Sequence, residues 1–181
     1  MKAAILSGAT AAALVLGVGL ATAQEEAPFG DEASVGYAEQ LYAAMEELCL
    51  AGENAIDTMP YPGSDPHGAM LETFHTTLEL EGHTGHLSVK RNYAPASREE
   101  VQGARDEHLA SITVMYQRED GYDPDNMNWF WVKYLPDGSL DRNPQGMALA
   151  GRVAKGADQG CIACHGAAPG GDYLYTTDFV R

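Results

Sequence analysis

Residues 86–93 read His86-Leu87-Ser88-Val89-Lys90-Arg91-Asn92-Tyr93. Apolar and polar side chains alternate along this stretch, with Leu87, Val89 and Tyr93 on one side and His86, Ser88, Lys90 and Asn92 on the other. A period of two is typical of a β-strand that buries only one of its faces. The stretch therefore predicts a strand with Lys90 on its polar face.

Two more strands are predicted on the C-terminal side of this one. Residues 111–117 alternate in the same way, and residues 128–135 carry aromatic side chains on both faces, Trp129 and Trp131 against Phe130, Val132 and Tyr134. A strand that is apolar on both faces is expected to be buried on both sides. Residues 71–80 fit a helix and a strand equally well, and residues 173–176 are expected to form a last short strand.

Helical spacing is confined to the N-terminal part of the chain and to short pieces. From Ser34, the expected N-cap, apolar residues recur at Ala38, Leu41, Tyr42, Met45, Leu48 and Cys49, and Gly52 ends the predicted helix. Cys49 is expected to be a buried, inert thiol on the apolar face of this helix. Ser97 and Glu100 have the spacing of a capping box, which predicts a second, short helix.

The first 23 residues have the pattern of an export signal. Lys2 supplies the positive charge, residues 3–20 the apolar run, and Ala21-Thr22-Ala23 the cleavage site. We expect a signal peptide over residues 1–23, a flexible lead over residues 24–33 and a single domain over residues 34–181. The expected product is a soluble periplasmic protein without a membrane anchor.

The net charge of the chain limits its partners. The formal charge is −15, and loss of Lys2 with the signal makes it about −16. Such a surface argues against nucleic acid and against an anionic membrane. A small neutral or cationic substrate, or a basic redox protein, remains compatible with it.

The strongest motif is Cys161-Ile162-Ala163-Cys164-His165. On one helical turn, positions i, i+3 and i+4 face the same way, so both thiols and the imidazole can meet one flat ligand. Cys-x-x-Cys-His is the attachment signature of haem c, with two thioethers and a histidine bound to the iron. A zinc site that takes a further ligand from elsewhere and a redox disulfide are the alternatives.

The position of the motif narrows the class of haem protein. No methionine, histidine or lysine follows His165, so the later axial ligand of small electron-carrier cytochromes is missing. The strand pattern of residues 86–135 argues against a four-helix bundle. The sequence therefore predicts an α+β fold, mainly an antiparallel β-sheet, with an N-terminal helix and a short C-terminal haem-binding helix.

The chain resembles the cytochrome P-460 family over roughly residues 60–178. The matching blocks are Pro66-His67-Gly68, residues 87–93, Thr113-Val114-Met115-Tyr116, Gly121-Tyr122-Asp123-Pro124, residues 129–134, Pro136-Asp137-Gly138, the Cys161–His165 motif and Asp172-Tyr173-Leu174-Tyr175. Their common order along the chain is more specific than any single block.

This resemblance implies an antiparallel β-sheet domain, usually dimeric, that carries one five-coordinate haem c with His165 as the axial iron ligand. Family members with known activity oxidise hydroxylamine, and their electrons would pass to a soluble redox protein. Relatives of the same fold, the cytochromes c-prime beta, mainly bind nitric oxide. In the hydroxylamine-oxidising members a lysine is bonded to a haem meso carbon, and Lys90 is the candidate here. A solvated strand lysine is the alternative.

Three functions follow as hypotheses: oxidation of hydroxylamine or a related nitrogen species, NO binding without catalysis, and simple electron transfer. The family's active members use a distal carboxylate. Glu107, Glu119 and Asp120 are close in sequence to the predicted strands, but none lies on a predicted strand face beside Lys90. The remaining candidates are Arg152 and Lys155 for the haem propionates, Met115 and Tyr116 for the distal pocket or the core, and His67, His75, His83, His86 and His108 as a sixth ligand. Trp129 and Trp131 are expected to pack in the core or against the haem.

Overall fold

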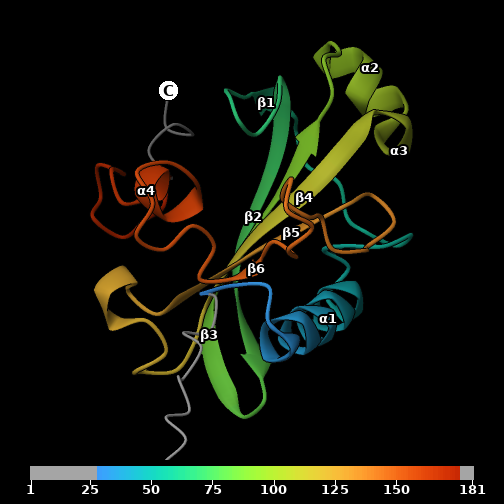
Figure 1. Ribbon diagram of the computed structural model, residues 1–181. Helices are drawn as coiled ribbons and strands as arrows, with labels where there is room; N and C mark the ends of the chain where they lie inside the picture. Colours follow the sequence, from blue (N-terminus) through green and yellow to red (C-terminus); the bar gives the residue numbers. More distant parts are fainter. Residues whose placement is uncertain (1–27, 176–181) are drawn as a thin grey trace, which may run out of the picture.

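A six-stranded antiparallel sheet forms the centre of the protein, whose computed structural model describes residues 28–175 (Figure 1). The strands are β1 (Tyr61–Pro62), β2 (Met70–Leu80), β3 (His83–Tyr93), β4 (Leu109–Gln117), β5 (Trp129–Tyr134) and β6 (Ala150–Gly151). Each strand pairs with the next one along the chain, so the sheet is a simple meander. The helices are α1 (Glu32–Glu47), α2 (Arg98–Gly103), α3 (Arg105–His108), η1 (Pro124–Asn126) and α4 (Cys161–His165).

The structure confirms the alternation that predicted the strands. The stretch 86–93 lies within β3, and the ambiguous segment 71–80 belongs to strand β2. Strand β5 is buried on both faces, as its aromatic composition predicts. The capping box is also present, because the Ser97 hydroxyl accepts from the Glu100 amide while the Glu100 carboxylate accepts from the Ser97 amide.

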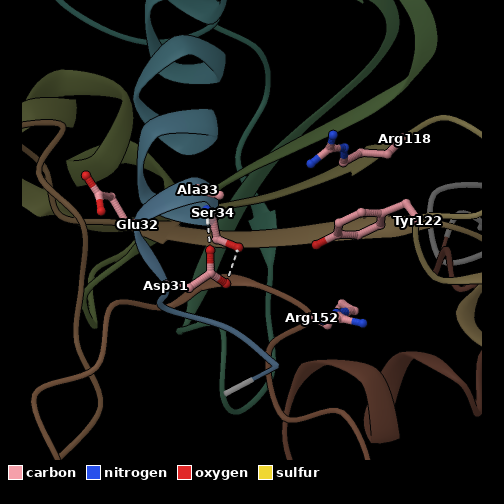
Figure 2. A pocket seen from close by; sticks show the side chains of 7 residues that line it. All are labelled: Asp31, Glu32, Ala33, Ser34, Arg118, Tyr122 and Arg152. Carbon is pink, nitrogen blue, oxygen red and sulfur yellow. Dashed lines mark hydrogen bonds between the residues drawn. The ribbon is translucent and has the colours of Figure 1, made fainter. Parts of the chain in front are cut away.

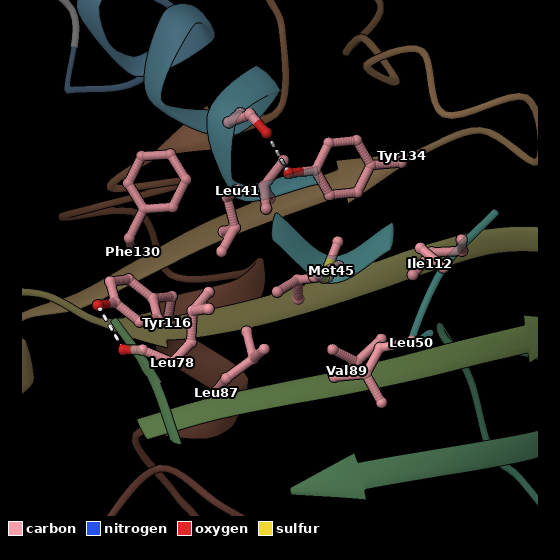
Figure 3. Packing of buried hydrophobic residues seen from close by; sticks show 14 of the residues in the cluster. Leu41, Met45, Leu50, Leu78, Leu87, Val89, Ile112, Tyr116, Phe130 and Tyr134 are labelled. Atoms are coloured by element: carbon pink, nitrogen blue, oxygen red, sulfur yellow. Dashed lines mark hydrogen bonds between the residues drawn. The ribbon is translucent and has the colours of Figure 1, made fainter. Parts of the chain in front are cut away.

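Helix α1 covers one face of the sheet (Figures 1 and 3). Its Leu41 and Met45 pack on apolar side chains of the central strands, which include Leu87, Val89, Ile112, Tyr116, Phe130 and Tyr134. Burial of each such side chain stabilises the fold by about 1.5–3 kcal/mol. The Tyr134 hydroxyl also donates to the Ala38 carbonyl of α1 at 2.7 Å, which fixes the helix against β5.

The opposite face of the sheet packs against the C-terminal part of the chain and helix α4 (Figure 1). Trp129 and Trp131 of β5 and Met115 of β4 form an apolar cluster there with Ile162 of α4. The two apolar faces of β5 therefore pack against different elements: Phe130, Val132 and Tyr134 against α1, and Trp129 and Trp131 against α4 and its neighbours. Met115 lies on the α4 side, whereas Tyr116 belongs to the core under α1.

The start of the domain differs from the sequence prediction. Asp31, and not Ser34, is the N-cap of α1, since its carboxylate accepts hydrogen bonds from the Ser34 amide and hydroxyl at 2.8 and 2.9 Å. Phe29 forms a β-bridge with Gly151. Residues 29–33 of the expected flexible lead are therefore part of the fold, because they close the edge of the sheet at β6.

Two further predictions are wrong in detail. Helix α1 ends at Glu47, so Cys49 lies beyond the helix, with a positive φ of 56° and a half-buried side chain. Residues 173–175 form no strand; the Asp172 carbonyl instead accepts from the Trp129 indole, and the Tyr173 carbonyl faces His165.

The α+β class with an antiparallel sheet, an N-terminal helix and a short C-terminal helix at the motif is confirmed. The expected signal peptide, residues 1–23, lies outside the described residues. Within residues 28–175, no helix combines the length and apolar character needed to cross a bilayer.

Candidate functional site

The Cys161–His165 motif forms the one-turn helix α4, as its spacing predicts. Gly160, with a φ of 119°, precedes the turn and Gly166 follows it. Neither thiol is in a disulfide; Cys161 is half-buried and Cys164 is exposed. Burial raises the pKa of the Cys161 thiol. His165 is only 8% exposed, so the helix presents its imidazole inward.

His165 is held by one ring nitrogen and surrounded by aromatic rings. Its Nδ1 lies 2.7 Å from the Tyr173 carbonyl oxygen. A carbonyl can only accept, so Nδ1 carries the proton and Nε2 keeps a free lone pair. Ring centroids of Trp131, Tyr175 and His67 lie 5.0, 5.5 and 5.9 Å from that of His165. Histidines that bind metals are oriented in this way, by a hydrogen bond from the other nitrogen.

The strand register determines which side chains lie on the sheet face that α4 covers. Directly paired residues of antiparallel strands share a face. One row across the sheet consists of Thr73, Lys90, Thr113 and Lys133. The neighbouring row consists of His75, Ser88, Met115 and Trp131. Because Trp131 contacts His165, both rows belong to the surroundings of the motif.

Lys90 lies on the polar face of β3, in agreement with the sequence, and its charge acts on the motif histidine. Burial lowers the pKa of His165, and the Lys90 ammonium lowers it further, although the bond to the Tyr173 carbonyl opposes this. Burial, Lys90 and His165 together lower the pKa of His67 to about 4. Lys90, His67 and His165 thus come from distant parts of the chain to one place.

Two buried polar atoms on this face have no hydrogen-bond partner. They are the indole Nε1 of Trp131 and the amide oxygen Oδ1 of Asn92, whose residues are 2% and 1% exposed. The amide nitrogen of Asn92 donates to the hydroxyls of Ser111 and Thr113, both at 3.2 Å. Native proteins rarely leave such groups unpaired, so each indicates a partner other than these side chains.

The donor set fits a haem c. Two free thiols and a buried imidazole with a free Nε2 lie on one helical turn, and an aromatic and cationic sheet face lies next to them. The ring centroids of Trp131 and His67 lie 5.0 and 5.9 Å from that of His165, at interplanar angles of 66° and 89°, and fill the space beside the imidazole. A macrocycle bound to His165 would displace these ring contacts.

A zinc site receives less support from the arrangement of side chains. In the described part of the chain, no three histidine, cysteine, aspartate or glutamate side chains converge in a way that could hold a metal ion. A structural zinc site needs about four such ligands. Haem iron needs only one of them from this motif, His165.

The two basic residues considered for the propionates have other neighbours. Lys155 forms ion pairs with the buried Asp123 and, at 3.5 Å, with Asp125. Arg152 lines a cavity of about 570 Å³ with Asp31, Arg118 and Tyr122, to which no residue of α4 contributes (Figure 2). Its guanidinium lies 6.0 Å from the Tyr122 ring centre.

The acids considered as a distal base also lie apart from Lys90. Glu107 is exposed on α3, at the end of the sheet. Glu119 pairs with Arg118 at 2.9 Å, and Asp120 accepts from the Asn128 amide at 3.5 Å in the loop after β4. The register around Lys90 includes none of these three.

Among the five candidate histidines, the structure brings His67 to the motif. His67 lies in the loop between β1 and β2, and its Nδ1 is 3.3 Å from the Thr113 hydroxyl. Sequence reasoning named His67 only as one of five possible sixth ligands, and it gave no role in the site to Asn92 or Thr113. For Asn92, the alternation of β3 could have indicated a place in the site, because it puts Asn92 on the same strand face as Lys90.

Comparison of the chain with protein-family models, with curated proteins and with solved structures found no match.

Proposed function

We propose that this chain is an exported mono-haem c protein of the cytochrome P-460 type that oxidises hydroxylamine or a related small nitrogen species. Cys161 and Cys164 would hold the haem through thioethers, and His165 would bind its iron. The observation that carries the proposal is the Cys-x-x-Cys-His turn, whose histidine is buried against the sheet face that bears Lys90.

When bound, a haem iron of this kind supplies a Lewis-acidic position for a small N-donor and accepts electrons from it. The side chains around the motif supply the rest. The Tyr173 carbonyl holds His165 in the tautomer that binds metal through Nε2. Trp131 and Tyr175 pack against the imidazole and exclude water from it. Lys90 is the candidate for a bond to the macrocycle.

A non-catalytic NO-binding protein is the second candidate function. One observation favours it: the acids considered as the distal base, Glu107, Glu119 and Asp120, are exposed or held by partners away from Lys90. Hydroxylamine carries protons that its oxidation must remove, and a nearby base helps to remove them. NO carries none, so its binding needs no such residue.

The remaining parts of the proposal concern location and partners. The expected signal peptide sends the chain to the periplasm, where a soluble redox protein would accept the electrons. A homodimer is the assembly that the family resemblance implies. The charge of −15 is suited to a basic redox partner.

The decisive test is purification from a strain that matures c-type cytochromes. We expect a coloured protein whose denatured chain retains haem, and a C161A/C164A variant that does not retain it. The matched control is C49S, which removes the third cysteine and should leave haem attachment unchanged. A colourless product, or haem lost from the denatured wild-type chain, contradicts the proposal.

Lys90 is tested with a matched lysine on the same cross-strand row. If Lys90 is bonded to the macrocycle, K90M converts a red-shifted Soret band into that of an ordinary haem c, and K133M leaves it unchanged. Turnover of hydroxylamine by the wild type favours the enzyme. NO binding without turnover favours the second function, and a low-spin, six-coordinate resting spectrum favours a simple electron carrier.

A further inference from the structure

The carbonyl that holds His165 belongs to a residue with an unusual backbone conformation. Tyr173 has a φ of 67°, in the left-handed region that residues other than glycine rarely adopt. Such a conformation persists only where the surrounding structure holds it. In this conformation the Tyr173 carbonyl oxygen lies 2.7 Å from Nδ1 of His165. The orientation of the imidazole therefore depends on the groups that hold Tyr173.

The phenol of Tyr173 is held by the loop between β4 and β5. Its hydroxyl donates to the amide oxygen of Asn126 at 3.1 Å. The amide nitrogen of Asn126 donates in turn to the Asp123 carboxylate at 2.8 Å, and the same carboxylate forms an ion pair with Lys155. Because an ion-paired carboxylate only accepts, the amide of Asn126 cannot turn around. Its oxygen is therefore the atom that faces Tyr173.

The loop has the properties of an anchor for another segment. Asp123 and Asn126 are only 1% and 8% exposed. The Asp123 carbonyl accepts from the backbone amides of Asn126 and Asn128 at 2.9 and 2.8 Å. The loop is thus closed by its own hydrogen bonds, and Tyr173 is attached to it through one hydroxyl.

From this arrangement we propose that Tyr173 is a positioning residue, which links the Asp123–Asn126 loop to His165 and keeps Nε2 of His165 free to bind a metal. The loop holds the phenol, and the carbonyl of the same residue orients the imidazole. The inference rests on the proposed function, because the metal concerned is the haem iron. It adds that Asn126, distant from the motif in sequence, tunes that iron through Tyr173. A hydrogen bond from Nδ1 makes an imidazole a more basic ligand, which favours the oxidised metal.

The test is the stretching vibration of the bond between iron and His165, measured by resonance Raman scattering on the ferrous holoprotein, together with the redox potential. Y173F removes the hydroxyl and keeps the ring, and N126A removes the amide that accepts from it. Each should reduce the population with the held carbonyl about fivefold, the typical effect of one lost hydrogen bond. We expect the vibration to shift to lower frequency and the potential to rise. Y173F/N126A should shift both no further, because the two substitutions break the same link.

Two control variants remove groups outside this link. Y134F removes a structural hydroxyl on the opposite face of the sheet, which donates to the Ala38 carbonyl at 2.7 Å. It should lower the stability of the fold and leave the vibration and the potential unchanged. D125N removes the charge of an exposed carboxylate 3.5 Å from Lys155 and keeps the loop backbone, so it should also leave both unchanged.

Two outcomes in the holoprotein would overturn the inference. One is an unchanged vibration in Y173F and N126A, and the other is an equal shift in Y134F, which would indicate general loosening of the fold.

If the wild type carries no covalent haem, the proposed function fails, and the link is measured separately in the haem-free chain. The NMR shifts of the imidazole nitrogens then report the tautomer of neutral His165. A single tautomer in the wild type and a mixture in Y173F and N126A supports the link. A mixture in the wild type, or a single tautomer in all variants, refutes it.

Discussion

Removal of the charge on Glu72 is expected to destabilise the fold strongly. This strand residue of β2 is fully buried, on the sheet face opposite Lys90. One carboxylate oxygen accepts from the Tyr93 hydroxyl at 2.5 Å and from Arg91 at 3.4 Å. The other accepts from the Arg105 Nε and from the Thr58 amide, both at 3.1 Å. Burial and the adjacent carboxylate raise the pKa of Tyr93, so its hydroxyl stays protonated and donates.

The size of the effect follows from these four contacts. Removal of one partner from a buried ion pair typically costs about 3–5 kcal/mol, because the remaining charge stays buried without compensation. In E72Q, both arginines keep one ion-pair partner, the half-exposed Asp57, whose carboxylate lies 3.9 Å from Arg91 and 3.1 Å from Arg105. We therefore expect a loss of about 3 kcal/mol, the lower end of this range. For a chain of this size this is a fall in Tm of roughly 6–12 °C.

The assay is urea unfolding followed by circular dichroism, with thermal unfolding in parallel. E79Q is the matched control, because Glu79 lies on the same strand but is exposed, and a change within about 0.5 kcal/mol is expected. Y93F removes a single bond to the carboxylate and should cost about 1.5–3 kcal/mol. A loss below about 1 kcal/mol in E72Q, with an unchanged denaturant slope, would refute the argument that the buried charges depend on one another.

Two further predictions concern local structure. Burial would raise the pKa of Asp31, but hydrogen bonds from the Ser34 amide and hydroxyl outweigh it and hold the pKa below 3.8, so the wild type should lose stability as pH falls through that pKa. D31N keeps the cap without the titration; its stability, measured by urea unfolding from pH 6 to 2, should fall less steeply, and an identical slope would exclude this role of Asp31. A Cβ on Gly85 would lie 1.9 Å from the Gln117 carbonyl oxygen, so G85A should cost more than about 2 kcal/mol or separate β3 from β4. G103A, where a Cβ meets nothing within 4 Å at the end of α2, should be neutral or stabilise by up to about 1 kcal/mol; equal Tm values for the two variants would contradict the steric argument.

Local patterns in the sequence were sufficient for most of the strands and for the main helix. The alternation in residues 86–93 and the two apolar faces of residues 129–134 reflect a period that depends only on backbone geometry. The same holds for the motif, whose spacing puts Cys161, Cys164 and His165 on one turn whatever surrounds it. Ends of elements were less predictable. Asp31 replaces Ser34 as the cap because the chain first pairs with β6, a contact that no local pattern encodes.

The buried acid Glu72 and the histidine His67 show the limit of such reasoning. In the sequence, Glu72 is one acid among 26 and His67 one histidine among six. Their partners are distant in the chain and are brought together by strand register and by loop closure. Side-chain periodicity specifies a face but carries no information about which strand or loop lies opposite.

The amino-acid sequence by itself therefore determined an antiparallel sheet with Lys90 on its polar face, one amphipathic helix before it and a Cys-x-x-Cys-His turn after it. Only the tertiary structure decided that α1 and α4 cover opposite faces, and that His165 meets Trp131 and His67 on the face of Lys90. The physical reason is the distance along the chain between the residues that interact. Secondary structure follows from neighbours a few residues apart, whereas a site depends on which buried surfaces and hydrogen-bonding groups satisfy one another across the whole fold.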